Sequence, residues 1–249
     1  MSGKSFSVLT WNIACLPKFI NSLQDPLKKA DEIFEKALSS NADVICFQEV
    51  FDYTIQRKAI DFFKDHGYHI HYSSENDSFI PKNGLFTASK FEIKTRNVID
   101  YNESVGVEKW VNKGLLTCEI IHPSLGDIII HNTHLQSDTD FWPRFLSEKC
   151  RGRQIETITK YLDLSTSALT LLVGDLNDTY SIVKQKYIDD IGFSIMNEEP
   201  IVTYPKKNKQ LDYVLLNSDN HAVTYQMING LINDMSDHNI MICDIKLDH

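Results

Sequence analysis

The sequence lacks any long apolar run, and this absence excludes a membrane-spanning helix. No stretch of the 249 residues approaches the roughly 18 consecutive apolar residues that such a helix needs. The first nine residues carry one lysine and no apolar run of signal-peptide length. The sequence therefore predicts a cytoplasmic protein without a signal peptide, which reaches a membrane only at its surface.

Closely spaced cysteine pairs are also missing. The five cysteines are an odd number and lie far apart in the chain, at Cys15, Cys46, Cys118, Cys150 and Cys243. Because no Cys-x-x-Cys motif occurs, a thiolate metal site has no support. Several of the cysteines stand in apolar runs, and this predicts buried thiols in a reducing compartment.

Linkers and an excess of positive charge are missing as well. No repeat, low-complexity tract or Pro/Gly/Ser linker interrupts the chain, so we expect residues 1–249 to form one domain and to be monomeric. The 25 Lys and Arg against 34 Asp and Glu give a net charge of −9. Such a chain has no overall field that attracts a polyanion, so local groups or a metal ion must neutralise any substrate phosphate.

Short β-type runs dominate what is present. They lie at 6–13, 43–50, 84–88, 113–121, 127–133, 168–173, 211–216, 222–227 and 240–245. Apolar residues at helical spacing predict helices over 27–38 and in the segment that follows Arg151. This mixture predicts a layered α/β (α+β) fold with sheets in the middle and helices outside.

Polar residues stand where several of these runs end. They form six short motifs: Asn12, Gln48-Glu49, Asn132-Thr133-His134, Gly174-Asp175-Leu176-Asn177, Asp212 and Ser236-Asp237-His238. Buried carboxylates and amides cost free energy of desolvation unless they have partners. Ligand sites of layered α/β proteins often gather at strand ends. We therefore expect one shared site at an edge of the sheets.

The oxygen atoms in this set predict a magnesium or manganese site. Carboxylates come from Glu49, Asp175 and Asp237, and amide oxygens from Asn12 and Asn177. Hard oxygen ligands without a thiolate suit Mg²⁺ or Mn²⁺ rather than zinc.

The histidines of the set supply acid–base chemistry. His238 can act as a general base that Asp212 orients, and His134 can donate a hydrogen bond to a phosphoryl oxygen. Together with a metal ion, this set predicts attack of water on a phosphate ester. His131 and His134 do not predict a zinc pair, because residues three apart on a strand face opposite ways.

Each residue also has a structural explanation when taken alone. A single histidine at a strand end is more often a hydrogen-bonded structural residue. Asp175 can cap a helix that begins near Thr179, and Asp212 can pair with Lys209. The number and order of the motifs favour the functional interpretation.

The six motifs, in this order, resemble the endonuclease/exonuclease/phosphatase superfamily from one end of the chain to the other. The resemblance implies a four-layer αββα sandwich, two mixed β-sheets face to face with helices outside, and a Mg²⁺-dependent phosphoesterase. It also implies roles for the site residues: a metal held by Asn12 and Glu49 with Asp237 as a further ligand, the scissile phosphate contacted by His134 and Asn177, phosphate and leaving group positioned by Asp175, and His238 as the base with Asp212 behind it.

Other segments resemble the neutral sphingomyelinase branch of that superfamily. They lie at 48–51, 83–90, 113–116, 133–136 and 151–154. The implied reaction is phospholipase C cleavage of sphingomyelin to ceramide and phosphocholine. The aromatic hairpin of the secreted bacterial enzymes is missing, since only 24 residues separate Asp212 from Asp237. Phe141, Trp142 and Phe145 form a loop that either enters a bilayer interface or packs on itself.

Two other functions remain open. A nuclease of the same superfamily would use nearly the same motifs, and Lys206, Lys207 and Lys209 could contact its backbone phosphates. A non-catalytic binding module on the same fold is less compatible with the complete set of polar residues.

Overall fold

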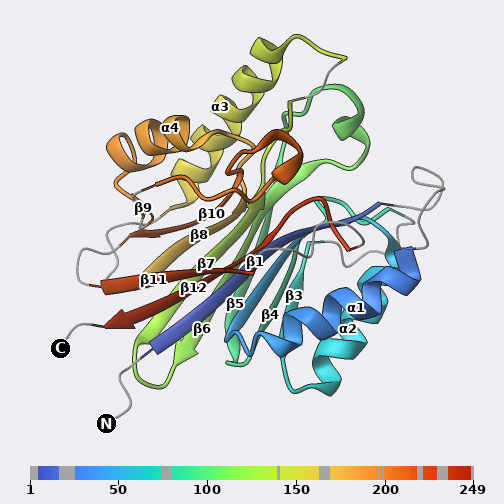
Figure 1. Ribbon diagram of the computed structural model, residues 1–249, viewed down its shortest axis with the longest axis vertical. Helices are drawn as coiled ribbons and strands as arrows, with labels where there is room; N and C mark the ends of the chain where they lie inside the picture. The colour runs from blue at the N-terminus through green and yellow to red at the C-terminus, as the bar shows by residue number, and fades with distance from the viewer. Residues whose placement is uncertain are drawn as a thin grey trace.

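Two six-stranded β-sheets lie face to face, with helices on both outer faces, in the computed structural model (Figure 1). It describes residues 5–16, 26–73, 80–138, 141–162, 169–195, 197, 199–217, 221–228 and 235–247. Both sheets contain parallel and antiparallel pairs, so the predicted mixed four-layer sandwich is confirmed.

The first sheet combines strands from both ends of the chain. Its strands, from edge to edge, are β11 (His221–Ile228), β12 (Ile240–Leu247), β1 (Ser5–Cys15), β2 (Val44–Val50), β4 (Phe86–Ser89) and β3 (His69–Tyr72). Two amphipathic helices cover its outer face, α1 (Pro26–Ser39) and α2 (Tyr53–Asp65).

The second sheet is built from the middle of the chain. Its strands, from edge to edge, are β5 (Ile93–Tyr101), β6 (Lys113–His122), β7 (Gly126–His134), β8 (Leu169–Asp175), β10 (Asp212–Asn217) and β9 (Ser194–Ile195). Its outer face is covered by α3 (Arg144–Tyr161), α4 (Tyr180–Val183) and the π-helix η2 (Lys184–Asp189). Two short 3-10 helices, η1 (Gly106–Trp110) and η3 (Pro205–Lys207), lie in the loops.

All nine predicted β-type runs overlap observed strands, and the helix predicted over 27–38 corresponds to α1. The prediction for α3 was too short, because this helix begins at Arg144 rather than after Arg151. Its buried face includes Ser147, Arg151 and Gln154, so its first turns show no apolar periodicity. None of the helices in the described ranges is long and apolar enough to cross a membrane. All five cysteines are buried, as expected, and none of them forms a disulfide.

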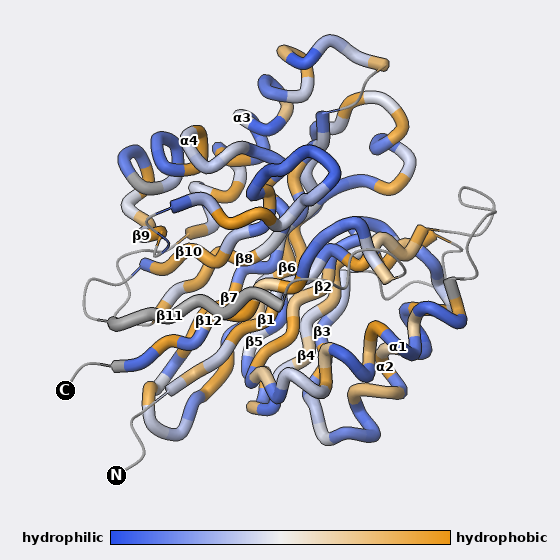
Figure 2. Tube along the Cα trace, viewed as in Figure 1, coloured by the Kyte–Doolittle hydropathy of each residue, from blue (hydrophilic) through white to orange (hydrophobic). Residues whose placement is uncertain are grey.

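The face that each sheet turns toward the other changes character along the strands. On β1 the inward positions include Val8, Thr10 and Asn12, and on β8 they include Leu171, Val173 and Asp175. Side chains of a strand alternate between its two faces, so these residues continue one interior surface from an apolar to a polar end. In Figure 2 orange stretches recur along the interior strands, whereas the segment that carries η3 is blue.

A buried hydrogen-bond network marks the boundary between the two ends. Gln48 Nε2 donates to Asn132 Oδ1 across the sheets at 2.9 Å and to Thr10 Oγ1 at 3.1 Å. Asn132 Nδ2 donates to the backbone oxygens of Phe47 and Phe86. These bonds satisfy polar groups that would otherwise be buried without partners, and they fix the two sheets relative to each other.

Candidate active site

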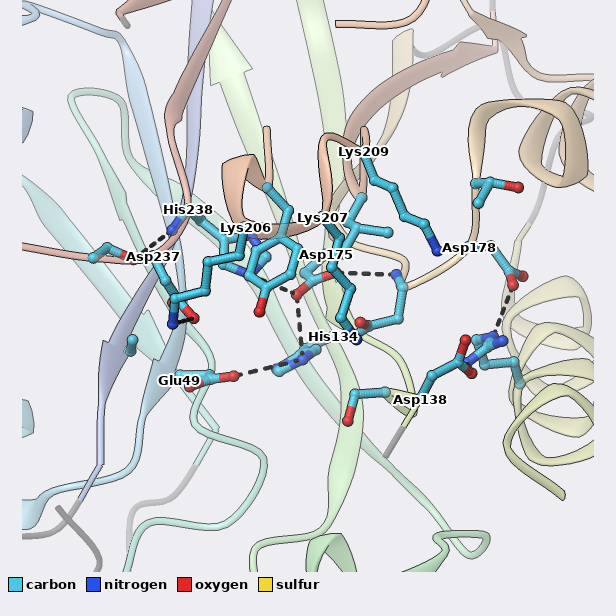
Figure 3. A pocket seen from close by; sticks show the side chains of 18 of the residues that line it. Glu49, His134, Asp138, Asp175, Asp178, Lys206, Lys207, Lys209, Asp237 and His238 are labelled. Atoms are coloured by element: carbon cyan, nitrogen blue, oxygen red, sulfur yellow. Dashed lines mark hydrogen bonds and ion pairs between the residues drawn. The ribbon is translucent and has the colours of Figure 1, made fainter. Parts of the chain in front are cut away.

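A cavity of about 680 Å³ opens at the polar end of the sandwich (Figure 3). Its walls come from both sheets and from the loops at their ends, and include Glu49, His134, Asp175, Asn177, Tyr204, Asp237 and His238. Asn12 and Asp212 lie directly behind this wall, bonded to residues that line it. The structure thus brings all eight predicted site residues together, although they come from six separate parts of the sequence.

His238 is bound to a buried carboxylate. Its Nδ1 lies 2.7 Å from Asp212 Oδ2, and its Nε2 lies 3.8 Å from Asp175 Oδ2. The alternative pairing of Asp212 with Lys209 is therefore not the one observed. Trp11 Nε1 donates to the backbone oxygen of His238 at 3.0 Å, and the Tyr204 ring lies 4.9 Å from the imidazole, centre to centre. These contacts hold the imidazole with Nε2 toward the cavity.

The charges around His238 decide its protonation. Burial alone would lower the pKa of His238, but the carboxylates of Asp212 and Asp175 outweigh burial and raise it to about 10. Burial and the neighbouring Asp212 raise the pKa of Asp175 to about 7. The carboxylates therefore hold a proton on the imidazole. Their negative charge would also favour binding of a cation at this site.

Strand pairing places His134, Asp175 and Asp212 side by side. His134 pairs with Asp175 across β7 and β8, and Asp175 pairs with Asp212 across β8 and β10. His134 Nε2 lies 3.5 Å from Asp175 Oδ2. This spacing needs a glycine at 174, where φ is +134° and a Cβ atom would lie 2.0 Å from the Thr133 oxygen.

Glu49 enters the cavity through an unusual backbone conformation. Gln48 points inward, so a regular strand would turn Glu49 toward the outer helices. Instead Glu49 has φ of +60°, and its Oε1 lies 3.9 Å from His134 Nε2. A left-handed conformation at a glutamate costs on the order of 1–3 kcal/mol, and such strain is commonly found at functional sites. Burial raises the pKa of Glu49, although the ammonium of Lys113 opposes this effect.

Each of the two predicted asparagines makes a hydrogen bond with a backbone group, and Asn12 also donates to two carboxylates. Asn12 Nδ2 donates to Glu49 Oε1 and Asp175 Oδ2, both at 3.1 Å, and its Oδ1 accepts from the Ala14 backbone at 3.1 Å. Asn177 donates from Nδ2 to the Leu135 oxygen at 3.0 Å. Its backbone N–H donates to Asp175 Oδ1 at 3.0 Å. Asp175 therefore orders its own loop rather than capping α4, whose N-cap Thr179 makes no side-chain capping bond.

The oxygen atoms of the cavity fit a hard divalent cation. The carboxylates of Glu49 and Asp175 both accept a hydrogen bond from the Asn12 amide nitrogen. Because burial raises the pKa of both carboxyls, a cation beside them would offset their negative charge. One possible metal-ligand atom each of Asp175, Asp212 and His238 also lies within 4.8 Å of the other two. Asp237 lines the same cavity, where its Oδ2 pairs with Lys206 Nζ at 3.1 Å.

Sequence reasoning assigned no role to two buried cations near the site. Lys113 Nζ lies 2.9 Å from His134 Nε2 and 3.1 Å from Glu108 Oε1, and the side chain is almost fully buried. Burial, Lys113 and His238 hold the pKa of His134 well below its usual value, so this imidazole is neutral. The only sequence signal for Lys113 was a charged residue at the start of an apolar strand.

Arg151 is the second buried cation. Its Nε donates to Asp178 Oδ1, and an Nη donates to the Gln136 oxygen and to Asp138 Oδ1, each at 2.8 Å. The guanidinium thus joins the loop after His134 to the loop after β8 and holds one wall of the cavity. No pattern along the sequence reveals these partners, because they come from different loops.

Comparisons with known proteins agree with this architecture. Residues 9–238 match the model of the Endonuclease/Exonuclease/phosphatase family. A sequence comparison with curated proteins finds no match.

Solved structures share the fold at low sequence identity. Sphingomyelinase C from Streptomyces griseocarneus is 19% identical, with 97% of this chain and 99% of that chain covered and a TM-score of 0.77. A mutant beta toxin from Staphylococcus aureus with bound magnesium ions is 17% identical, with coverages of 98% and 100% and a TM-score of 0.78. Truncated TDP2 from Caenorhabditis elegans is 21% identical, with coverages of 97% and 98% and a TM-score of 0.70. Since the family model spans most of the sequence, the chain belongs to the endonuclease/exonuclease/phosphatase family.

Proposed function

We propose that the protein is a Mg²⁺-dependent phosphodiesterase in which His238 activates water. The observation that carries this proposal is the convergence, in one cavity, of a carboxylate-bound histidine with carboxylates from both sheets. Because Asp212 occupies Nδ1, Nε2 of the unprotonated ring is the atom that accepts a proton from water. The water oxygen then bonds to phosphorus, the bond from phosphorus to the leaving oxygen breaks, and that oxygen takes up a proton from solvent, while His238 returns its proton to solvent.

The remaining residues bind the phosphate and a cation. A neutral His134 and the Asn177 amide would donate to phosphoryl oxygens, and Asp175 would orient the phosphate and its leaving group. Glu49 and Asn12 would hold Mg²⁺ or Mn²⁺, with Asp237 as a further ligand. The cation would polarise the phosphoryl group and offset the carboxylate charge that keeps a proton on His238.

For the substrate we propose sphingomyelin, cleaved to ceramide and phosphocholine. The sequence segments that resemble neutral sphingomyelinases support this choice, and a sphingomyelinase C has the same fold. A net charge of −9 accords with a zwitterionic substrate, which needs no overall positive field.

A nuclease is the second candidate, because three lysines of the segment that carries η3 line the cavity. Figure 3 shows Lys206, Lys207 and Lys209 along one side of it, with Lys206 beside Asp237. Cations in this position could hold the phosphates that flank a scissile bond. Binding of DNA by such a site would weaken steeply with salt concentration, whereas binding of a zwitterionic lipid would not.

A substrate panel tests the proposal. Purified protein is incubated with sphingomyelin vesicles, with abasic duplex DNA and with intact duplex DNA, each with Mg²⁺ and with a chelator. We expect phosphocholine release only with Mg²⁺. Nicked DNA with intact lipid would overturn the choice of substrate and retain the phosphodiesterase, whereas no turnover of any phosphodiester would overturn both.

A further inference from the structure

Large exposed apolar side chains gather in one place. Of the seven found in the described part of the chain, five lie on two segments: Val107 and Trp110 on η1, Phe141 and Trp142 just before α3, and Phe145 in its first turn. Trp110 is 84% exposed and Phe141 is 93% exposed. We call these five residues the aromatic platform. The other two, Ile121 and Tyr161, belong to β6 and to the last turn of α3.

The two segments form one continuous surface. A Cβ atom on Gly106 would lie 2.6 Å from Trp142 Nε1, so η1 packs directly against the Trp142 ring. A shallow apolar cavity of about 380 Å³ lies between them, lined mainly by Val105, Val107, Trp110, Trp142 and Leu146. Figure 1 draws the green segment that contains η1 beside the yellow-green start of α3. The loop is therefore not packed only on its own aromatic rings.

The platform borders the candidate active site. Arg144, which lies between Trp142 and Phe145 in the sequence, lines the catalytic cavity together with Asp138. Glu108 of η1 accepts hydrogen bonds from the backbone and the hydroxyl of Ser137, another residue of that cavity. A surface that rests on the platform would therefore lie next to the cavity.

We propose that the aromatic platform binds a phospholipid membrane surface, a proposal that rests on the proposed lipid substrate. Tryptophan and phenylalanine favour the boundary between head groups and acyl chains. The platform also carries the exposed Lys109, whose charge complements lipid phosphates, and Arg144, which pairs with Glu148 at 2.9 Å and with Asp138 at 3.6 Å. Bound in this way, the protein would present a lipid head group to His134 and His238 without a membrane-spanning segment.

The tryptophans of the chain offer a direct test. Among the three, Trp11 is fully buried, whereas Trp110 and Trp142 both belong to the platform. The His238→Ala protein is mixed with sphingomyelin/phosphatidylcholine vesicles whose acyl chains carry bromine, a quencher of tryptophan fluorescence. We expect quenching that is lost when Trp110 and Trp142 are both replaced by Phe, since Trp11 cannot reach the bilayer.

Vesicle sedimentation supplies the matched comparison. Each aromatic side chain that leaves the interface weakens binding by about tenfold, so Trp110→Ala with Phe141→Ala lowers vesicle affinity roughly 100-fold. Ile121→Ala with Tyr161→Ala, two exposed apolar residues outside the platform, leaves vesicle affinity unchanged. Near-ultraviolet circular dichroism checks that each variant is folded.

Three outcomes would contradict the platform as a membrane surface. One is equal vesicle affinity of the two double variants, and another is the absence of quenching in the His238→Ala protein. The third is a platform variant that changes only the mass in sedimentation equilibrium, which would assign the surface to self-association. Because binding is measured without turnover, failure of sphingomyelin hydrolysis leaves these readouts intact and separates the two proposals.

Discussion

The apolar and polar ends of the space between the sheets are built on the same strands. At one end Val8, Val44 and Ile130 fill the interior, and a few residues further along the same faces stand Asn12 and His134. The backbone geometry is shared, so the difference lies in side-chain chemistry. The apolar end stabilises the fold because it excludes water. The polar end lowers stability, because it buries charged groups and holds Glu49 in a strained conformation, but it places reactive side chains together.

The largest expected effect is loss of catalysis at the polar end. Replacement of His238 by Ala removes the proton acceptor, and we expect kcat to fall by roughly 10²- to 10⁴-fold. Phosphocholine release by a protein with native near-ultraviolet circular dichroism measures this effect. Wild-type turnover in that variant would contradict the assignment of His238 as the base.

The opposite effect is expected at the apolar end. Leu171, fully buried between the sheets, lies on the same strand and face as Asp175. Leu171→Ala should lower the free energy of unfolding by about 2–5 kcal/mol through a cavity, as measured in denaturant. The kcat of the folded fraction should not change. A variant of unchanged stability but low kcat would show that the two ends are not separate.

A pH titration tests whether the buried His131, on β7, is neutral. Burial lowers the pKa of His131 to about 4, whereas an unfolded histidine titrates near 6.5, so the unfolded chain binds this proton more tightly. The stabilisation from a neutral His131 is complete above about pH 6.5 and decreases as the pH falls toward 4, by about 3 kcal/mol in all. His131→Gln should make the unfolding free energy less dependent on pH over this range than it is in the wild type. Equal pH dependence of the unfolding free energy in the variant and the wild type would contradict a neutral buried His131.

The smallest effect is expected at the boundary between the ends. Asn132→Ala leaves Gln48 Nε2 and two backbone oxygens with fewer partners, at a cost of about 1–3 kcal/mol in unfolding free energy. Denaturant unfolding measures this cost. An unfolding free energy of Asn132→Ala equal to that of the wild type would contradict the inference that the hydrogen bonds of Asn132 fix the two sheets relative to each other.

Much of the fold could be predicted because one alternation rule governs both ends. Period-two apolar patterns located the central strands and placed Asn12, His134 and Asp175 at their ends. The rule failed for β5, where most residues between Ile93 and Tyr101 are exposed or partly exposed at a sheet edge. Such a strand has no buried face that leaves a pattern in the sequence.

The site was predicted less completely, for a different reason. Carboxylates and histidines at strand ends are visible in the sequence because they are costly to bury. Lys113 and Arg151 look like ordinary surface charges until their partners, Glu108 and Asp178, are brought beside them by the fold. The conformation of Glu49 was also invisible, because a sequence pattern does not report a left-handed residue at a strand end.

The dependence of catalysis on Mg²⁺ tests the central claim most directly. The rate of phosphocholine release is measured against Mg²⁺ concentration for the wild-type protein and for Glu49→Gln. We predict a saturable, chelator-sensitive rate for the wild type, and for the variant little activity at any Mg²⁺ concentration. A wild-type rate that chelator leaves unchanged, or a variant with the wild-type Mg²⁺ response, would contradict the polar end as a cation-dependent phosphodiesterase site.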